Sequence, residues 1–531
     1  MNGRMVARLW NRDASVFAAA SDPAVRAAIE HRLGWLDAPA AMRAHLDEIT
    51  SVTRQVQANG FTALCLLGMG GSSLCAEVLR QTLAPAAMRP HVHVLDTTDE
   101  RAIGRVSASL TPATTLFVVA SKSGSTIEVT ALEAHFRQWV ADAGIAIPGR
   151  HFIAITDPDT SLGAHATAHG YRHTFINPAD IGGRFSALSL FGLVPAALMG
   201  IDPASLLESA ETMVGACRLE GDDADENAGV VLGEFMATQA KAGRDKLTVL
   251  LPDSMAALGL WIEQLVAEST GKLGTGVLPI VDEPAAADFA EYGKDRAFVL
   301  VADPAAPTAV SRRQALAAAG HPVLHLQSTP AHLGAEFFRW EFATAIAGIL
   351  LNVNPFDEPN VRDAKSRTQA LLSRGEPLPV DPPLVERHGV LGRSHRPDGV
   401  NRAGGFVAIL DYMPQDSGRH AAVARVRAAI RRRTKAATTY GVGPRYLHST
   451  GQFHKGGTNA GLFLLLTADD AAQTAVPGAD YTFSRLKHAQ ALGDYEALCA
   501  NGRHVVHMHV ADAHADFSAA LERLITQAME R

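Results

Sequence analysis

Short apolar runs alternate with amphipathic stretches along most of this chain. The apolar runs, such as residues 115–119, have the length and composition of buried strands. The amphipathic stretches, such as residues 127–140, place apolar side chains three or four positions apart and predict helices. Strands that alternate with helices pair in parallel, so the pattern predicts α/β sheets covered by helices.

Three sets of such elements are expected. Strands are predicted over residues 62–67, 92–95, 115–120 and 152–156 in the first set, 246–251, 297–302 and 323–326 in the second, and 405–412 and 462–467 in the third. Helices are predicted over residues 74–83, 127–140, 256–269, 342–351 and 421–434. A final strand followed by a helix is expected to complete the third set.

The same pattern predicts domain boundaries. An acidic stretch at residues 220–226 separates the first two sets, and the proline-rich residues 377–383 predict an extended linker before the third. The predicted parts are a helical lead-in at residues 1–57, two α/β domains at 58–218 and 227–375, and a smaller C-terminal α/β module at 385–531.

Composition is that of an ordinary globular protein. The 531 residues are 47% hydrophobic and 19% charged, which predicts two to four folded domains rather than a disordered chain. A net charge of −7 argues against nucleic acid as a partner. An anionic substrate would therefore need a locally positive site.

The cysteines and the N-terminus favour a cytoplasmic location. The four cysteines show no Cys-x-x-Cys spacing, which favours a reducing compartment over a disulfide framework. The first residues lack a signal sequence, and no apolar run reaches the length of a membrane span. We expect no membrane partner.

The most informative segment is the loop at residues 121–128, between the strand at 115–120 and the helix that follows. Its small hydroxyl side chains and one glycine leave backbone N–H groups free, and the helix dipole adds partial positive charge. The loop is therefore predicted to hold a phosphate, while residues elsewhere carry out the chemistry.

A second glycine-rich turn covers residues 68–73. It is either a tight turn without a ligand or part of a dinucleotide-binding fold, because Gly68, Gly70 and Ser73 nearly fit that fingerprint and Asp96 ends the next strand. The fingerprint lacks its last glycine. The separate loop at 121–128 favours a phosphorylated sugar instead.

Glu268 is a candidate general base. It shares a helix face with Gln264, and the helix is expected to end at Gly271. The partial negative charge at a helix C-terminus disfavours a carboxylate, so the pKa of Glu268 should rise. A raised pKa suits a general base, which must take up a proton and return it. The alternative is an exposed glutamate at a helix end.

Two cationic residues are further candidates. Arg184 follows two glycines within residues 181–186, where a guanidinium can stabilise an oxyanion, although such an arginine alone is more often structural. Lys365 ends a segment that begins at Asn354 and is, taken alone, an ordinary lysine at the start of a helix.

Taken together, five segments in this order resemble the phosphoglucose isomerase family. They are the glycine-serine turn at residues 70–72, the loop at 121–128, Gly-Gly-Arg-Phe-Ser at 182–186, Gln-x-x-x-Glu-Ser-x-Gly-Lys at 264–272, and the Asn-x-Phe-Asp segment that runs to a lysine at 354–365. The C-terminal module, through residues 445–452, is similar to the isomerase half of transaldolase/phosphoglucose isomerase fusion proteins.

The resemblance implies a fold and a reaction. It implies two doubly wound, flavodoxin-like sugar isomerase (SIS) domains with the active site between them. The implied reaction interconverts glucose 6-phosphate and fructose 6-phosphate through a cis-enediolate, without a metal or another cofactor. It further implies a phosphorylated sugar as substrate, a homodimer, for which the apolar helices after Phe337 are candidates, and a functional link to transaldolase.

It also implies a role for each site residue. Glu268 would move the proton between C1 and C2, Arg184 would stabilise the enediolate, and Lys365 would assist ring opening. The phosphate would be held by Ser121, Ser123 and Thr126, with Lys122 contributing backbone contacts and charge. The remaining residues that would line the site are Gly71, Ser72, Gly183 and Gln264.

The chain departs from the family pattern at two positions. The family has a ring-opening histidine about thirty residues after the glutamate, whereas residues 292–298 contain none, and Arg296 cannot transfer a proton usefully. Glu358 stands where the family has glutamine, so it would either pair with Lys365 or weaken substrate binding.

Two histidines of the C-terminal module are candidates for the missing group. His448 and His454 have the required proton-transfer chemistry, and we hypothesise that His448 is the replacement. The alternative is that their turn only supports the module or a subunit interface.

Other functions stay open at this point. The chain would otherwise be an isomerase of another phosphosugar, such as mannose 6-phosphate, or a phosphosugar-binding regulatory protein of the same fold. A dehydrogenase is the most distant alternative.

Overall fold

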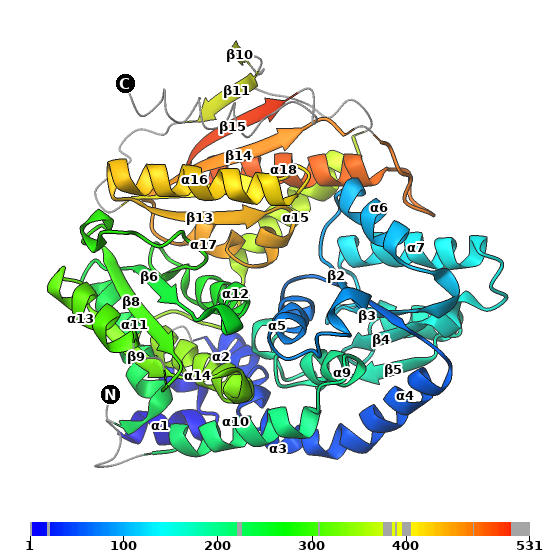
Figure 1. Ribbon diagram of the computed structural model, residues 1–531, viewed down its shortest axis with the longest axis horizontal. Helices are drawn as coiled ribbons and strands as arrows, with labels where there is room; N and C mark the ends of the chain where they lie inside the picture. The colour runs from blue at the N-terminus through cyan, green and yellow to red at the C-terminus, as the bar shows by residue number, and fades with distance from the viewer. Residues whose placement is uncertain are drawn as a thin grey trace.

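The computed structural model describes most of the chain. The described residues are 3–17, 22–219, 226–305, 308–374, 385–387, 390–395, 405–470 and 472–510. They form three sheets surrounded by helices, so the predicted α/β class is confirmed (Figure 1). The predicted linker at 377–383 and nearly all of the acidic stretch at 220–226 lie outside the described residues.

The first sheet has five parallel strands in the order β2-β1-β3-β4-β5. The strands are β1 (Ala63–Gly68), β2 (Val92–Leu95), β3 (Thr115–Ala120), β4 (Phe152–Thr156) and β5 (His173–Ile176). All residues of β3 and β4 are buried, which explains their uninterrupted apolar runs. This strand order is flavodoxin-like, as the family resemblance implied, and ligands bind such sheets at the carboxyl ends of the strands.

Helices cover both faces of this sheet. They include α5 (Leu74–Thr82), α6 (Glu100–Ser109), α7 (Ile127–Asp142), α8 (Ser161–Ala168) and α9 (Leu190–Leu198). The core on one face joins the sheet to the lead-in and to the second set, and the core on the other face joins it to α7 and the C-terminal module.

The second sheet has four parallel strands in the order β7-β6-β8-β9. The strands are β6 (Lys246–Leu250), β7 (Leu278–Ile280), β8 (Arg296–Ala302) and β9 (Val323–Gln327). Its helices are α11 (Ala228–Lys241), α12 (Leu258–Thr270), α13 (Thr308–Ala318), α14 (Leu333–Leu351) and α15 (Pro359–Leu372).

The third sheet has the order β10-β11-β15-β14-β12-β13. Its strands are β10 (Val385–Arg387), β11 (Val390–His395), β12 (Phe406–Asp411), β13 (Ala437–Val442), β14 (Gly461–Ala468) and β15 (His504–Val510). Strands β13, β12, β14 and β15 are parallel and repeat the order of the second sheet, whereas β10 and β11 pair antiparallel. Its helices are α16 (Ser417–Thr434), α17 (Gly451–Gly456) and α18 (Phe483–Ala500).

Helix α18 of this module was not expected. It lies between β14 and β15, the last described strand, and a helix expected after that strand falls on residues outside the described part of the chain. Most residues of α18 are buried, because the helix packs against α15 as well as its own sheet. Its buried side chains include polar ones such as Ser484, Lys487 and Gln490, so its apolar residues do not form the single stripe that makes a helical pattern visible in a sequence.

The lead-in is a series of short helices rather than a continuous one. They are α1 (Gly3–Trp10), α2 (Pro23–Glu30), α3 (Ala38–Ala41) and α4 (Leu46–Ala58). Proline lies in the first turn of both α2 and α3, which explains the breaks. The Trp10 ring stacks on Phe338 and Phe342 of α14, which ties this part to the second set.

Helix α14 was a candidate for a subunit interface. It begins nine residues before the predicted start, and nearly all of its side chains are buried within the chain, largely against α11 and α10 (Pro203–Cys217). Its apolar surface is therefore used inside the chain, and the interface expectation is wrong for this helix.

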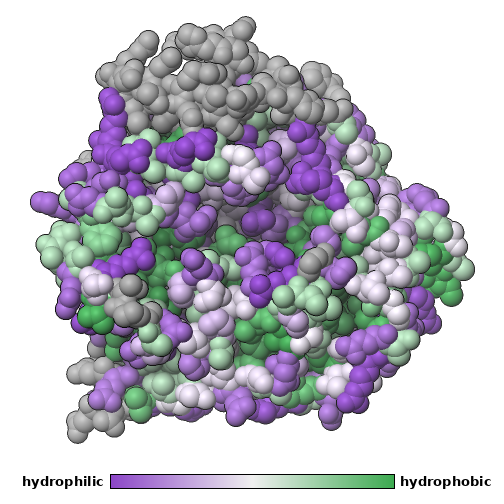
Figure 2. All heavy atoms as spheres, in the orientation of Figure 1, coloured by the Kyte–Doolittle hydropathy of each residue, from purple (hydrophilic) through white to green (hydrophobic). Residues whose placement is uncertain are grey.

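The three sheets share cores and are not separate bodies. One apolar cluster runs from the lead-in through both of the first two sets, and another combines residues of α18 with residues of the first sheet. The face seen in Figure 2 mixes hydrophilic and apolar side chains and is hollowed near its centre, where the three sheets meet. Among the described helices, none is long and apolar enough to cross a membrane.

Candidate active site

The predicted phosphate loop connects β3 to α7. Gly124 has a φ of +69°, and an added Cβ would lie 2.7 Å from the side chain of Thr160, so the turn requires glycine. The hydroxyl oxygens of Ser121 and Thr126 are 3.1 Å apart. Thr126 is the N-cap of α7 but makes no side-chain capping bond, so its hydroxyl does not occupy the amides of the first turn.

Lys122 does not direct its charge into this loop. Its Nζ forms an ion pair with Asp157 and lies 3.4 Å from the carbonyl oxygen of Ala179. The charge that we expected Lys122 to offer a phosphate is therefore taken up by Asp157, and only backbone contacts remain available from this residue.

Glu268 and Arg184 lie together. Helix α12 ends at Thr270 with Gly271 as its C-cap, which confirms the predicted helix end. Nη1 of Arg184 is 3.3 Å from Oε1 of Glu268. The other guanidinium nitrogens of Arg184 donate to the hydroxyl of Ser269 and to backbone carbonyls before Glu358, so the group is held in one orientation.

Glu268 is buried and not an exposed residue at a helix end. It is 6% exposed, and burial raises its pKa. Glu358 raises the pKa of Glu268 further, while the positive charge of Arg184 opposes the shift. The pKa of Glu268 shifts upward, as predicted. The main cause of the shift is burial, whereas the prediction from the sequence rested on the position of Glu268 near the helix C-terminus.

Glu358 pairs with Arg184 and not with Lys365. Its Oε2 is 3.3 Å from Nη1 of Arg184. Burial alone would raise the pKa of Glu358, but Arg184 and Arg32 outweigh it and lower that pKa. The family's glutamine is thus replaced by a carboxylate that shares one guanidinium with Glu268.

The glycine-serine turn packs against Gln264 and Gly183. A Cβ on Gly70 would lie 2.7 Å from Nε2 of Gln264, and a Cβ on Gly71 would lie 2.0 Å from the carbonyl oxygen of Gly183. Ser72 is half-buried in the same turn. The turn therefore brings the first sheet within contact of α12 and of the segment that carries Arg184.

A cavity of 210 Å³ lies beside these residues. Its lining includes Ser123 and Thr126 of the phosphate loop, Lys365 of α15, and His448. Gln264 connects the cavity to the base, because its Nε2 is 2.7 Å from the carbonyl oxygen of His448 and 3.3 Å from Oε2 of Glu268. The structure thus brings the predicted residues of three separate segments to one place.

His448 is held by a carboxylate of the phosphate loop. Its Nε2 is 2.9 Å from Oε1 of Glu128, which is 3% exposed and lies in the first turn of α7. Burial would raise the pKa of Glu128, but His448 outweighs it and the pKa is lowered. Gln490 donates to the same oxygen at 2.7 Å and accepts a hydrogen bond from the hydroxyl of Thr98 at 3.0 Å.

Glu128 and Gln490 were not among the site residues predicted from the sequence. Glu128 belongs to the loop motif, but nothing local indicates its partner. Gln490 lies on α18, and its contact with Glu128 spans 362 positions of the chain. Such a contact leaves no local signal.

His454 and Arg296 are structural. His454 is buried beside the rings of Tyr446 and Phe463, neither of its ring nitrogens has a hydrogen-bond partner among the described residues, and burial places its pKa well below the usual value. Arg296 is fully buried and forms a two-pronged ion pair with Glu283 at 2.6 and 3.0 Å. His454 is therefore the wrong candidate of the two histidines.

The chain is similar to known sugar phosphate isomerases. Residues 35–296 match the family model for phosphoglucose isomerase. Glucose-6-phosphate isomerase of Thermosynechococcus vestitus is 29% identical over 446 residues, which cover 75% of this chain and 82% of that protein. The protein of the same name from Rubrobacter xylanophilus is 29% identical over 403 residues, covering 66% and 93%.

Solved structures share the fold. A hypothetical protein from Thermus thermophilus has a TM-score of 0.57 and 26% identity, covering 70% of this chain and 98% of that one. A glucose-6-phosphate isomerase from Chlamydia trachomatis has a TM-score of 0.52 at 19% identity, covering 63% and 75%. The family model ends at residue 296, so it does not reach Lys365 or His448.

Proposed function

We propose that this chain, which belongs to the phosphoglucose isomerase family, interconverts glucose 6-phosphate and fructose 6-phosphate. The observation that carries the proposal is the buried Glu268, whose pKa is raised and whose Oε1 lies 3.3 Å from Nη1 of Arg184. Gln264 links Glu268 to the backbone carbonyl of His448, which lines a cavity together with Ser123 and Thr126 of the predicted phosphate loop. A carboxylate of raised pKa beside a fixed cation suits the removal of a proton next to a carbonyl group.

Glu268 carries the proton between the two carbons. The carboxylate takes the hydrogen from C2 of the open-chain aldose, and the electron pair forms the C1–C2 double bond of an enediolate. Negative charge develops on the C1 oxygen, where Arg184 stabilises it. Glu268 then returns the proton to C1. The hydroxyl proton of the C2 oxygen moves to the negatively charged C1 oxygen, so the C2 oxygen becomes the carbonyl of the ketose and the C1 oxygen becomes a hydroxyl. The raised pKa of Glu268 serves both directions, since the group must accept and release the proton.

The phosphate and the sugar chain are held around this pair. Ser121, Ser123 and Thr126, with the amides at the start of α7, would bind the phosphate. Oε1 of Gln264 is buried and has no hydrogen-bond partner among the described residues, so it is available to a sugar hydroxyl. Gly71 packs closely against Gly183, and these two residues with Ser72 would line the site on the side of the glycine-serine turn.

Ring opening is assigned to His448 with Glu128. The carboxylate engages Nε2 of His448, which leaves Nδ1 as the nitrogen available for proton transfer to the ring oxygen. Lys365 lines the same cavity and would assist at the hydroxyl end of the sugar. This arrangement replaces the histidine that is missing after Glu268.

The test is conversion of fructose 6-phosphate to glucose 6-phosphate in a coupled dehydrogenase assay with EDTA present. We expect turnover by the wild type, and its loss in Glu268→Gln. Glu263→Gln is the matched control, because Glu263 is also buried on the same helix. Equal turnover in wild type and Glu268→Gln would refute the assignment of the base.

Other outcomes of the same assay would favour the alternatives. Turnover of mannose 6-phosphate without turnover of fructose 6-phosphate would indicate another phosphosugar. Phosphosugar binding without any turnover would indicate a regulatory protein. The homodimer, the link to transaldolase and the domain boundaries remain predictions.

A further inference from the structure

One face of α18 meets a row of carboxylates at the carboxyl edge of the first sheet. Asp99 and Glu100 follow β2, and Glu128 begins the helix after β3. The backbone N–H of Ser484 donates to Glu100 at 3.0 Å, and Nε2 of Gln490 donates to Glu128 at 2.7 Å. The C-terminal module is therefore seated over the edge of the sheet where the predicted phosphate loop lies.

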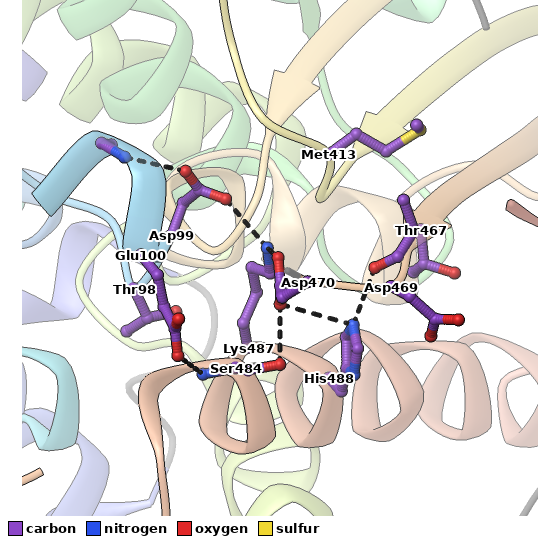
Figure 3. Close-up of polar contacts among 12 residues, drawn as sticks. Thr98, Asp99, Glu100, Met413, Thr467, Asp469, Asp470, Ser484, Lys487 and His488 are labelled. Carbon is purple, nitrogen blue, oxygen red and sulfur yellow. Dashed lines mark hydrogen bonds and ion pairs between the residues drawn. The ribbon is translucent and has the colours of Figure 1, made fainter. Parts of the chain in front are cut away.

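Lys487 stands at the middle of this face. Its Nζ is 2.8 Å from Oδ2 of Asp99 and 2.6 Å from Oδ1 of Asp470, and Figure 3 shows the side chain rising from α18 between the two carboxylates. Asp99 follows β2 of the first sheet, and Asp470 follows β14 of the third. One buried ammonium group thus joins the carboxyl edges of two sheets.

The charge of Lys487 is balanced by these two carboxylates and not by solvent. Burial would lower the pKa of Lys487, but Asp99 and Asp470 outweigh it and raise that pKa. Asp99 also caps α6 by accepting from the amide of Ala102 at 2.9 Å. Without the ammonium group, two buried carboxylates would face each other with no cation between them.

Two residues of α18 contact groups that position His448. Gln490, less than one turn beyond Lys487, donates to the oxygen of Glu128 that engages His448. Asp494, a further turn along, accepts a 2.7 Å hydrogen bond from the hydroxyl of Tyr446, two residues before His448. A shift of α18 would therefore move both the segment that carries the imidazole and one of the groups that orient its carboxylate.

We propose that Lys487 is a positioning residue, which fixes α18 on the first sheet and thereby places His448 in the cavity. The C-terminal module is then an integral part of the active site, supplied within the same chain. The catalytic consequence rests on the proposed function, because it concerns ring opening, whereas the seating of α18 does not.

The experiment compares Lys487→Met with Lys435→Met, a control at an exposed lysine of the same module. Enzyme-catalysed exchange between the α and β anomers of glucose 6-phosphate, measured by NMR magnetisation transfer, reports ring opening alone. We expect Lys487→Met to slow this exchange roughly 100-fold, because a misplacement of about 1 Å has that effect on an aligned group. Binding of the acyclic 6-phosphogluconate should change less than about threefold, since the phosphate loop is untouched.

A second variant separates positioning from folding. Lys487→Met combined with Asp99→Asn removes one of the two carboxylate charges that Lys487 balances, so Asp470 no longer faces a second carboxylate, and it keeps an amide that can cap α6. We expect this double variant to recover part of the lost exchange. Unchanged exchange in Lys487→Met, or loss of 6-phosphogluconate binding in parallel with the loss of exchange in both variants, would overturn the proposal.

The seating of α18 is tested independently by amide deuterium uptake. Uptake in α18 should rise in Lys487→Met and stay at the wild-type level in Lys435→Met, whether or not the protein is an isomerase. Absence of anomer exchange in the wild type would count against the proposed function only. Equal uptake in α18 of wild type and Lys487→Met would refute the seating itself.

Discussion

Glu268 and Glu128 are two buried glutamates near one cavity, and their surroundings shift their pKa values in opposite directions. Burial raises the pKa of Glu268, and the Arg184 guanidinium at 3.3 Å does not cancel the effect. Burial acts on Glu128 in the same way, but His448 at 2.9 Å outweighs it and the pKa is lowered. Arg184 divides its charge between Glu268 and Glu358, whereas His448 directs its Nε2 at Glu128.

The comparison assigns different tasks to two chemically identical side chains. A carboxyl group of raised pKa accepts a proton more readily, and one of lowered pKa stays ionised and orients its partner. Glu268 is therefore suited to proton transfer, and Glu128 to holding His448. Burial alone does not identify a base, since both residues are buried.

The sharpest way to break this comparison is to neutralise each glutamate in turn. Glu268→Gln should lower isomerisation by roughly 1,000-fold, because a general base contributes a factor of about 10² to 10⁴. Anomer exchange of glucose 6-phosphate should continue in this variant, since His448 and Glu128 are intact. Coupled turnover and NMR exchange measure the two steps separately. Loss of both steps in Glu268→Gln would show that the two carboxyl groups do not act separately.

His448→Ala should affect the complementary step. Turnover of the cyclic sugar should fall roughly 100-fold, because a proton-transfer group of the ring-opening step is lost. Anomer exchange should fall together with turnover. His454→Phe is the control, since His454 is buried among aromatic rings. The assignment fails if His448→Ala leaves turnover of the cyclic sugar intact while Glu268→Gln abolishes it.

Glu128→Gln should have a smaller effect than removal of the imidazole itself. The amide still accepts a hydrogen bond from Nε2 of His448 but no longer offers a negative charge. We expect anomer exchange to fall about tenfold, because the imidazole is retained and only its orientation and charge balance suffer. The measurement is the same NMR exchange. A loss as large as that of Glu268→Gln in isomerisation would indicate a direct role for Glu128 instead.

Glu358→Gln tests how much the charge of Glu358 contributes to the raised pKa of Glu268. The negative charge of Glu358 contributes to the raised pKa of Glu268 and competes for Arg184. Its removal should lower the pKa of Glu268 and move the acidic limb of the pH–rate profile to lower pH, with turnover at the optimum preserved. An unchanged acidic limb would mean that this limb does not report Glu268.

Glu263→Gln tests burial without function and should have the smallest effect on turnover. Burial raises the pKa of Glu263 to about 8, so the folded state binds the proton more tightly than the unfolded state. Stability of the wild type should then decrease as pH rises through the range from about 4.5 to about 8, by at most about 1.4 kcal/mol per pH unit. The glutamine variant lacks this titration, so its melting temperature should fall less over that range. Parallel melting profiles would show that Glu263 does not titrate there.

Much of the fold was predictable because its signals are local. Strands β2, β3 and β4 have the predicted bounds. For β3 and β4 the reason is that uninterrupted apolar runs mark strands that are buried on both faces. Helix α18 was not predicted, because its polar residues, such as Lys487 and Gln490, are buried together with its apolar ones and leave no clear amphipathic pattern.

Some features of the site were predictable from local sequence, and others depend on the folded structure. The loop after β3 and the glutamate near the end of α12 were found from turn chemistry and helix spacing, both of which depend on residues close in the chain. The direction of the Lys122 side chain, the partner of Glu358 and the choice between His448 and His454 depend on which groups meet after folding.

The sequence by itself indicated most of the βα alternation, the proposed phosphate loop and the proposed base, because each rests on periodicity or on backbone geometry within about one turn of the chain. Only the tertiary structure decided that His448 meets Glu128 across 320 positions and that Lys487 joins Asp99 to Asp470. Burial and pairing set the charge state of these groups, and both are properties of the packed molecule that no short segment contains.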